Sequence, residues 1–491
     1  MRSTLTSGNS VQRHSQTLPV LHWVVVALSC FPVTADSQQA KPAPPPFKPA
    51  PPPVRMYLPN IANEDWSFLK DPKYRADFWD PIKYISLKPE NWYLTLGGEI
   101  RLRPEGFRVR SAQGRPAILD NYLLHRYLFG ADLHMGKRFR VFGEFQSGIT
   151  NGKLASPRPT DKNLADIHQG FFEYKSASEG RRQVVIRAGR QELTVGSSRL
   201  IAASQGLNVK RSFDGFLAMY QRDSWTIEGA AARLVKLRPG FFDDPPDHEQ
   251  TFWGAAVSRR SFPWKSSQVG LYYLGIDRRV SQYVQGLGPE QRHTVGGKLT
   301  GTQGSFDFNF DLIGQWGRFQ NAGIRSWAIS TTTGYRFRTW RFRPRLAVAA
   351  NAASGDADPA DNQLGSFNPL FPGNSYSGLV GLLGPTNLTD VTPSFQLSLR
   401  RNVLLIFESP SYFRTSTGDG VYSIDLRLLL SPAGKADRYV GTNPGVVVAW
   451  QATRHINLSG VISRFLSGPF LKGTFVENGF GFYSLAFTYR F

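Results

Sequence analysis

The chain has 491 residues, 41% of them apolar, and its 58 Lys and Arg against 37 Asp and Glu give a formal charge of +21. This length allows two or three soluble domains or one large barrel, and no apolar run after residue 35 reaches the roughly 18 residues of a membrane-spanning helix. The single cysteine, Cys30, lies in a leader segment, which excludes disulfides, zinc–thiolate sites and cysteine nucleophiles from the mature protein.

Residues 1–35 have the pattern of a secretory signal peptide, with a short membrane anchor as the alternative. Arg2 and Arg13 supply a basic start, residues 18–31 form an apolar core, and a small-residue cleavage site ends at Ala35. We therefore expect an exported protein, for which nucleic acid is not a ligand. Its basic surplus then favours lipopolysaccharide or an acidic polysaccharide as partner.

Two segments separate this leader from the main body of the chain. Residues 36–56 are rich in proline, with an echo between KPAPPP at 41–46 and KPAPPP at 48–53, which predicts an extended periplasmic linker. A docking site for another protein is the other interpretation. Residues 57–91 are dense in Asp, Lys, Trp and Pro and predict a folded cap at the periplasmic end of a barrel.

From residue 92 to 491 the chain becomes a series of alternating segments of about ten residues, separated by Gly, Asn, Asp and Pro. In residues 305–315, for example, Phe306 and Leu312 fall on one face and Asp311 and Gln315 on the other. Alternation with a period of two places apolar side chains on one surface of a sheet. A soluble β-sandwich gives the same pattern, so the alternation alone does not decide between the two.

The end of the chain favours a barrel in a membrane. Tyr483, Leu485, Phe487 and Tyr489 alternate with smaller or polar residues, and the chain closes on Phe491. An apolar strand with a terminal aromatic is an outer-membrane assembly signal, whereas on a soluble protein it would be an exposed liability. We predict an all-β, transmembrane antiparallel barrel in the outer membrane of a Gram-negative cell.

In such a barrel the polar face lines the lumen, and this face carries many charges. The lumen candidates are Arg101, Arg103, Arg126, Arg140, Arg187, Arg345, Arg400, Arg490, Glu99, Asp132, Glu144 and Glu173. Arginine suits a polyuronate because its planar guanidinium binds carboxylates bidentately and stays charged. Arg140 and Arg187 are the sharpest candidates for an anion filter, and a wall stabilised by Arg–carboxylate pairs is the alternative role.

No pattern indicates catalysis or a cofactor. Motifs for serine hydrolases, zinc proteases, P-loops and dinucleotide binding are absent from the sequence. Asp356, Asp358 and Asp361 resemble a calcium loop but lack the glycine and glutamate of an EF-hand, which favours a solvated turn. The acidic residues of the 243–249 stretch receive the same interpretation.

Five motifs, in this order along the chain, resemble the alginate-export family of outer-membrane proteins. They are WYLTLGGEIR at 92–101, FRVFGEFQS at 139–147, RAGRQE at 187–192, RSFDG at 211–215 and FNPLFP at 367–372. The resemblance implies a monomeric barrel of about 18 strands, with 16 as the alternative, that passes alginate from the periplasm to the exterior. It also implies a periplasmic export scaffold as partner. The proline-rich linker departs from the family pattern.

Two other functions compete with export of an anionic polysaccharide. An anion-selective diffusion porin that takes up small acidic molecules would have nearly the same basic lumen. A barrel enzyme that modifies lipids would need a nucleophile beside a histidine, and none of the eight His has a suggestive Ser next to it. We therefore expect a channel.

Overall fold

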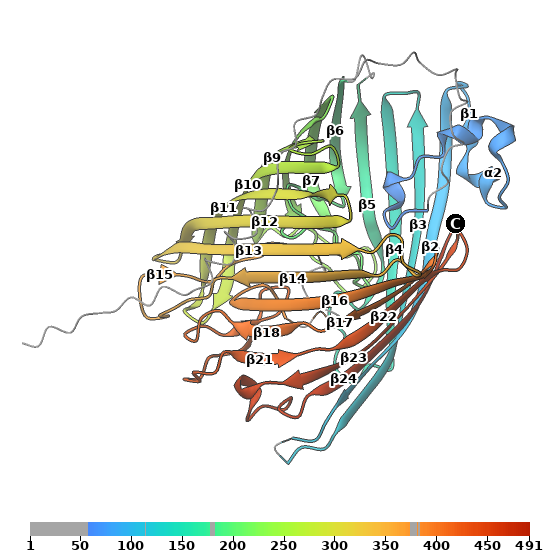
Figure 1. Cartoon of the computed structure of the whole chain (residues 1–491). Helices are drawn as coiled ribbons and strands as arrows, with labels where there is room; N and C mark the ends of the chain where they lie inside the picture. The colour runs from blue at the N-terminus through green and yellow to red at the C-terminus, as the bar shows by residue number, and fades with distance from the viewer. Residues whose placement is uncertain (1–56, 113, 177–181, 374–380, 382) are drawn as a thin grey trace, which may run out of the picture. The chain divides into compact units, whose positions relative to one another are not determined.

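The computed structural model describes residues 57–112, 114–176, 182–373, 381 and 383–491. The predicted signal peptide and proline-rich linker therefore lie outside the described residues. Among the described helices, none has the length and apolar character needed to cross a membrane. Nearly all regular structure of the described residues is β-strand (Figure 1).

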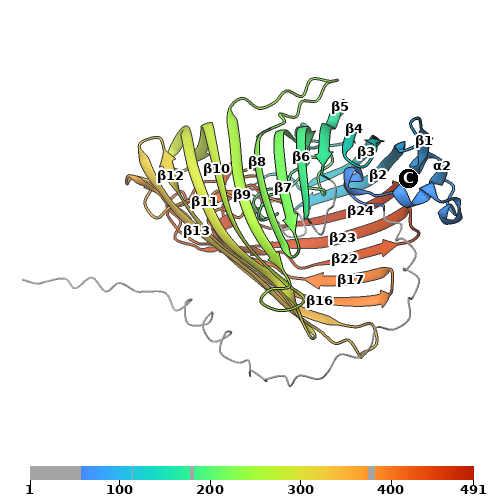
Figure 2. The ribbon, with the colours of Figure 1, turned by 90° about the horizontal axis from the view of Figure 1, so that it is seen from above.

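In the described chain, eighteen antiparallel strands form one closed barrel, which confirms the predicted fold. Strands that follow one another in sequence pair around the wall, and β24 (Phe480–Arg490) closes it against β2 (Trp92–Val109). Figures 1 and 2 show this closure where the red end of the chain returns beside blue β2. The strands between them are β3 (Ile118–Met135), β4 (Phe139–Asn151), β5 (Asn163–Lys175), β6 (Arg182–Gln191), β7 (Phe213–Arg222), β8 (Trp225–Leu234), β9 (Gln250–Arg260), β10 (Ser267–Tyr283), β11 (Gly286–Gln303), β12 (Phe306–Phe319), β13 (Ala322–Arg336), β14 (Arg345–Ala353), β16 (Leu388–Arg400), β17 (Val403–Glu408) continued by β18 (Ser411–Arg414), β21 (Tyr439–Thr442) continued by β22 (Gly445–Gln451), and β23 (Ile456–Ser467).

Short helices and strands lie at the two ends of the barrel. Before β2 the chain forms η1 (Ile61–Asn63), η2 (Ser67–Lys70), η3 (Pro72–Tyr74), α2 (Asp80–Lys83) and β1 (Ile85–Leu87). The loops carry β15 (Gln363–Leu364), the pair β19 (Val421–Tyr422) and β20 (Leu428–Leu430), and η5 (Pro469–Leu471). β1 extends the sheet beside the start of β2, where β24 does not reach.

The alternation read from the sequence explains how each strand sits in the wall. In β12, Phe306 and Leu312 are 52% and 59% exposed on the outside, whereas Asp311 and Gln315 are buried on the inside. An outer-membrane barrel presents its apolar face to lipid, so these exposed side chains need no protein partner. Gly189 in β6 has φ +127°, and a Cβ there would lie 2.3 Å from the Gly170 carbonyl oxygen, so only glycine fits this approach to β5.

The two ends of the barrel differ in the length of their connections. Turns such as 223–224 and 401–402 join strands at the end that holds Trp92 and Phe491, whereas the longer segments 192–212 and 354–373 lie at the other end. Outer-membrane barrels have short periplasmic turns and long external loops, which assigns the short-turn end to the periplasm.

The barrel interior differs from the expectation that polar side chains line it throughout. Segments 192–212 and 354–373 fold inward and bring Leu200, Ile201 and Phe371 against inward-facing apolar side chains of β7 to β14, such as Phe213 and Phe252. These residues form one buried apolar core on that side of the lumen. Because the inward loops supply apolar partners, the inner face of these strands need not be polar.

The segment before the barrel contacts its interior at the short-turn end. Ile61 and Ala62 of η1 pack against Leu128, Phe142 and Phe171 of the wall. The chain end is held here as well, since the Lys83 ammonium donates to the backbone carbonyl of Phe491 over 2.8 Å.

Candidate functional site

A polar cavity of about 450 Å³ lies on the side of the lumen formed by β2, β3, β23 and β24. Whereas the β7 to β14 side of the lumen is filled by the apolar core, this side presents charged and hydroxyl side chains. The described residues that give the cavity its charge are Arg101, Arg103, Arg126, Arg158, Arg490, Glu105 and Asp161. Five arginines against two carboxylates make this cavity the strongest candidate for an anion path.

Carbonyl groups of the inward segment 192–212 hold three of these arginines. Arg101 donates to the Leu207 carbonyl over 2.7 Å, and Arg103 donates to the Gly206 carbonyl over 2.6 Å. Arg126 donates to the same Leu207 carbonyl over 2.9 Å. The loop therefore fixes the guanidinium groups at the cavity rim without cancelling their charge, because carbonyl oxygens carry only partial charges.

Glu99 connects two arginines from opposite sides of the barrel closure. Its Oε1 accepts from Arg126 Nε over 2.8 Å, and its Oε2 accepts from Arg490 Nε over 2.9 Å. Glu99 is buried behind the cavity, whereas Arg490 reaches its lining. A buried carboxylate shared by two guanidinium groups leaves a net positive charge at this point of the wall.

A second group of predicted residues lies near η1, on β3 to β6. Arg140 binds both carboxylate oxygens of Asp132 over 2.7 Å and donates to the Ala62 carbonyl over 2.7 Å. Arg187 donates from Nε to Glu173 over 2.8 Å, and its guanidinium stacks 4.2 Å from the centre of the Phe171 ring. Each arginine is thus satisfied by a wall carboxylate, which is the geometry of the stabilising alternative and not of an open filter.

Glu144 belongs to a third group, which joins the inward segment to the wall. Glu144, His168 and Glu192 converge as one of two sets of metal-ligand side chains found among the described residues. Lys210 forms an ion pair with Glu192 inside this set, so the Lys210 ammonium takes the position that a metal ion would need. Burial opposes the ionisation of Glu192, but Lys210 and His168 outweigh it and hold its pKa at about 2.

The other metal-type set contains Asp166, Asp243 and Asp244, two of which come from the acidic stretch of the sequence. Asp244 Oδ2 already accepts from Asn163 over 2.6 Å, and Asp166 Oδ2 accepts from the Asp244 amide over 3.0 Å. These hydrogen bonds therefore hold the loop that contains Asp243 and Asp244 against β5.

The three aspartates considered for calcium do not converge in this way. Asp356 is buried, whereas Asp358 and Asp361 are exposed. Asp358 and Asp361 accept from the amides of Ala360 and Gln363, so they stabilise their own turns.

The two remaining predicted arginines lie away from the cavity. Arg345 at the start of β14 donates from Nε to Asp307 over 2.8 Å. Arg400 ends β16 at the short-turn end and is exposed to solvent.

The structure also contains interior residues that the alternation did not single out. Arg292 and Glu290 of β11 form a buried ion pair, and Asn368 of the inward loop donates to Glu290 over 3.0 Å. Arg158 and Gln205 reach the cavity from loops. The alternation of strand residues cannot locate residues of a loop. The motif FNPLFP at 367–372, which contains Asn368, was therefore the only signal in the sequence for the loop's contact with Glu290, and the family resemblance assigned no role to it.

Comparisons with known proteins identify the kind of barrel. The family model described as alginate export matches residues 92–478, which is well over half of the chain. No curated protein sequence matches this chain.

The fold of the chain is similar to several solved structures from Pseudomonas and Acinetobacter. A BenF-like porin from Pseudomonas fluorescens Pf-5 has a TM-score of 0.55 at 11% identity, covering 81% of this chain and 98% of the porin. OccK5 (OpdH) of Pseudomonas aeruginosa has a TM-score of 0.52 at 9% identity, covering 80% and 97%. OccAB2 of Acinetobacter baumannii has a TM-score of 0.53 at 9% identity, covering 81% and 98%. At these identities the likeness concerns the fold.

Proposed function

The chain belongs to the alginate export family of outer-membrane barrels, and on that premise we propose that its arginine-lined cavity passes an anionic polyuronate from periplasm to exterior. Five arginines around one cavity are the observation that carries this proposal. A polyuronate bears one carboxylate per sugar, and the fixed guanidinium groups around the cavity offer these carboxylates charged hydrogen-bond donors as the chain advances.

Passage requires that the polymer binds and also leaves. Glu105 and Asp161 lie in the same lining, and Glu105 pairs with Arg103 at 3.0 Å. These carboxylates reduce the attraction at single positions, so no subsite holds a polymer carboxylate tightly. The serine and threonine hydroxyls on β23 and β24 give neutral hydrogen-bonding partners for sugar hydroxyls between the charged positions.

The second candidate function is uptake of small acidic molecules by an anion-selective porin. It is favoured by the apolar core, which closes the β7 to β14 side of the lumen and leaves a cavity of about 450 Å³. A cavity of that size suits a small acid as well as one sugar segment of a polymer.

Planar-bilayer recording with uronate oligomers of increasing length separates the two functions. We expect chloride current to be blocked at lower concentration as the oligomer grows from one sugar to about ten, because successive carboxylates engage neighbouring arginines. A small-acid porin would instead bind the monomer as well as the decamer. Neutral oligosaccharides of equal length serve as the control, and equal block by them would contradict an anion path altogether.

A further inference from the structure

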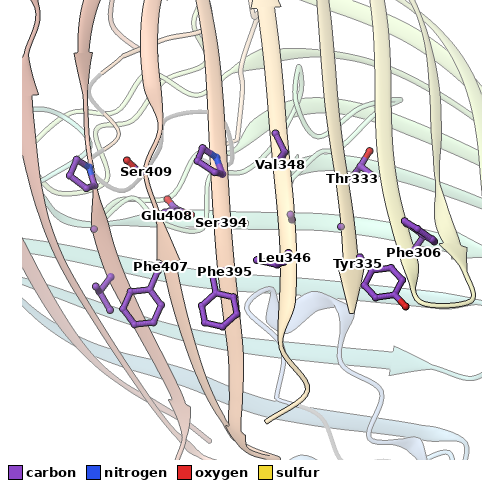
Figure 3. Close-up of a pocket in the computed structure, with 16 residues that line it drawn as sticks. Phe306, Thr333, Tyr335, Leu346, Val348, Ser394, Phe395, Phe407, Glu408 and Ser409 are labelled. Atoms are coloured by element: carbon purple, nitrogen blue, oxygen red, sulfur yellow. The ribbon is translucent and has the colours of Figure 1, made fainter. Parts of the chain in front are cut away.

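The outer wall of the barrel carries an apolar groove near its short-turn end. Figure 3 shows Phe407, Phe395, Leu346, Tyr335 and Phe306 in one row across neighbouring strands. Strand register places these residues directly opposite one another, from β12 through β13, β14 and β16 to β17. The groove has a volume of about 900 Å³, at the upper end of the range of ligand pockets of about 300–1,000 Å³.

Proline residues shape this part of the wall. Pro393 and Pro444 line the groove, and Pro410 breaks β17 from β18. Their carbonyl groups accept from Ser409, Arg464 and Asn443, but proline has no amide hydrogen to return to the neighbouring strand. Three adjacent strands are thus irregular at the level of the groove, which accounts for a hollow in an otherwise even wall.

Aromatic rings connect the groove to the turn between β13 and β14. Ring centres lie 4.8 Å apart between Phe306 and Tyr335, 4.9 Å between Tyr335 and Phe337, and 4.7 Å between Phe337 and Trp340. Trp340 is 62% exposed. A tryptophan at this height is typical of the layer where lipid headgroups meet acyl chains.

The same turn is strongly basic. Arg338, Arg341 and Arg343 are exposed in it, and the Phe342 carbonyl accepts from the Ser398 amide over 2.8 Å, which ties it to the end of β16. Arg400, the last residue of β16, and Arg401, in the turn that follows it, are exposed as well. Among the described residues, no carboxylate forms an ion pair with any of these five arginines. Five unneutralised cations therefore border the apolar groove along the side that faces the short turns.

We propose that this groove and the two arginine turns form a binding site for an anionic phospholipid of the periplasmic leaflet. One acyl chain lies along the row from Phe306 to Phe407, and the headgroup phosphate meets Arg338, Arg341 and Arg343. Clusters of exposed basic residues at a membrane surface favour anionic headgroups in this way. The site lies on the lipid face and is separate from the cavity inside the barrel.

Native mass spectrometry of the delipidated full-length barrel tests the site, with phosphatidylglycerol and phosphatidylethanolamine of identical acyl chains as probes. We expect one phosphatidylglycerol to bind at least tenfold more tightly than phosphatidylethanolamine. The triple variant Arg338→Gln, Arg341→Gln, Arg343→Gln should weaken phosphatidylglycerol by about a hundredfold. Val348→Trp, which fills the groove without a charge change, should weaken both lipids.

A triple variant on the opposite strands gives the matched control. Lys137→Gln, Arg138→Gln, Arg182→Gln removes the same charge from exposed positions at the same end of the barrel and should leave lipid binding unchanged. Equal loss in both triple variants would reduce the effect to general surface charge and overturn the site. Equal binding of the two lipids by the wild type would overturn it too. If the first triple variant still binds phosphatidylglycerol but is no longer blocked by polyuronate, the proposal is overturned and these arginines bind the polymer instead.

Discussion

Reversal of the charge of Arg103 is expected to weaken polyuronate binding in the cavity by about thirtyfold. Arg103 reaches the cavity lining with its side chain only 16% exposed, and it is held by Gly206 of the inward segment and by Glu105 of the wall. Two unit charges 4 Å apart interact by about 1 kcal/mol in water. Arg103→Glu replaces attraction by repulsion, so the change is about 2 kcal/mol, or roughly thirtyfold in binding.

The assay is the half-blocking concentration of polymannuronate on chloride current, with the reversal potential in a salt gradient as an independent measure. Arg103→Gln removes one charge and should raise the half-blocking concentration about fivefold. Arg400→Glu makes the same charge change as Arg103→Glu at an exposed position outside the cavity and should alter block by less than twofold. Similar effects of Arg103→Glu and Arg400→Glu would refute the reasoning, because the block would then follow overall charge.

Three further perturbations test the wall, the chain end and a loop. Arg140→Gln removes the guanidinium that binds both oxygens of buried Asp132 and leaves only His134 beside this carboxylate. It should lower the free energy of unfolding by about 3–5 kcal/mol while the anion preference persists, measured by urea titration and reversal potential. Deletion of Phe491 removes the contact with Lys83 and the terminal aromatic, and should reduce the yield of heat-modifiable barrel in the outer membrane. Burial raises the pKa of Asp356 to about 6, so stability should fall as the pH rises from about 4 to about 6; Asp356→Asn should remove this pH dependence and raise the melting temperature at pH 7.

The wall of the barrel could be predicted from the sequence because each strand repeats one simple rule. Phe306 and Asp311 occupy even and odd positions of the same strand, and this alternation alone decides which of them faces lipid. The closing strand was visible for the same reason, since Tyr483, Leu485 and Phe487 alternate up to the terminal Phe491. Closure itself, with Glu99 opposite Arg490, depends on register between the two ends of the chain, which no local pattern encodes.

The interior could not be predicted because loops determine it. The alternation predicted a polar lumen, whereas Leu200, Ile201 and Phe371 turn one side into an apolar core. These segments have no period, so the sequence gives no face to assign. The same limit applies to Arg101 and Arg140: both have inward parity, yet one borders the cavity and the other is held by Asp132 and η1.

The way in which the cavity arginines are held bears on how a basic channel would release an acidic polymer. Arg101, Arg103 and Arg126 each already donate to a backbone carbonyl of segment 192–212. A guanidinium has five N–H donors, so Arg101 and Arg103 keep donors for a polymer carboxylate, while the loop prevents their side chains from closing around it. Arg126 also donates to Glu99, which engages the other side of its guanidinium. The contact then resembles a solvated ion pair, which contributes about 0–1 kcal/mol, and not a desolvated bidentate pair. Several such weak contacts in sequence favour occupancy of the cavity by a polyanion, and the loss of any one contact costs little. Under the proposed function, the inward loop therefore serves movement as much as selectivity, because it holds the charges in place and keeps each of them from binding fully.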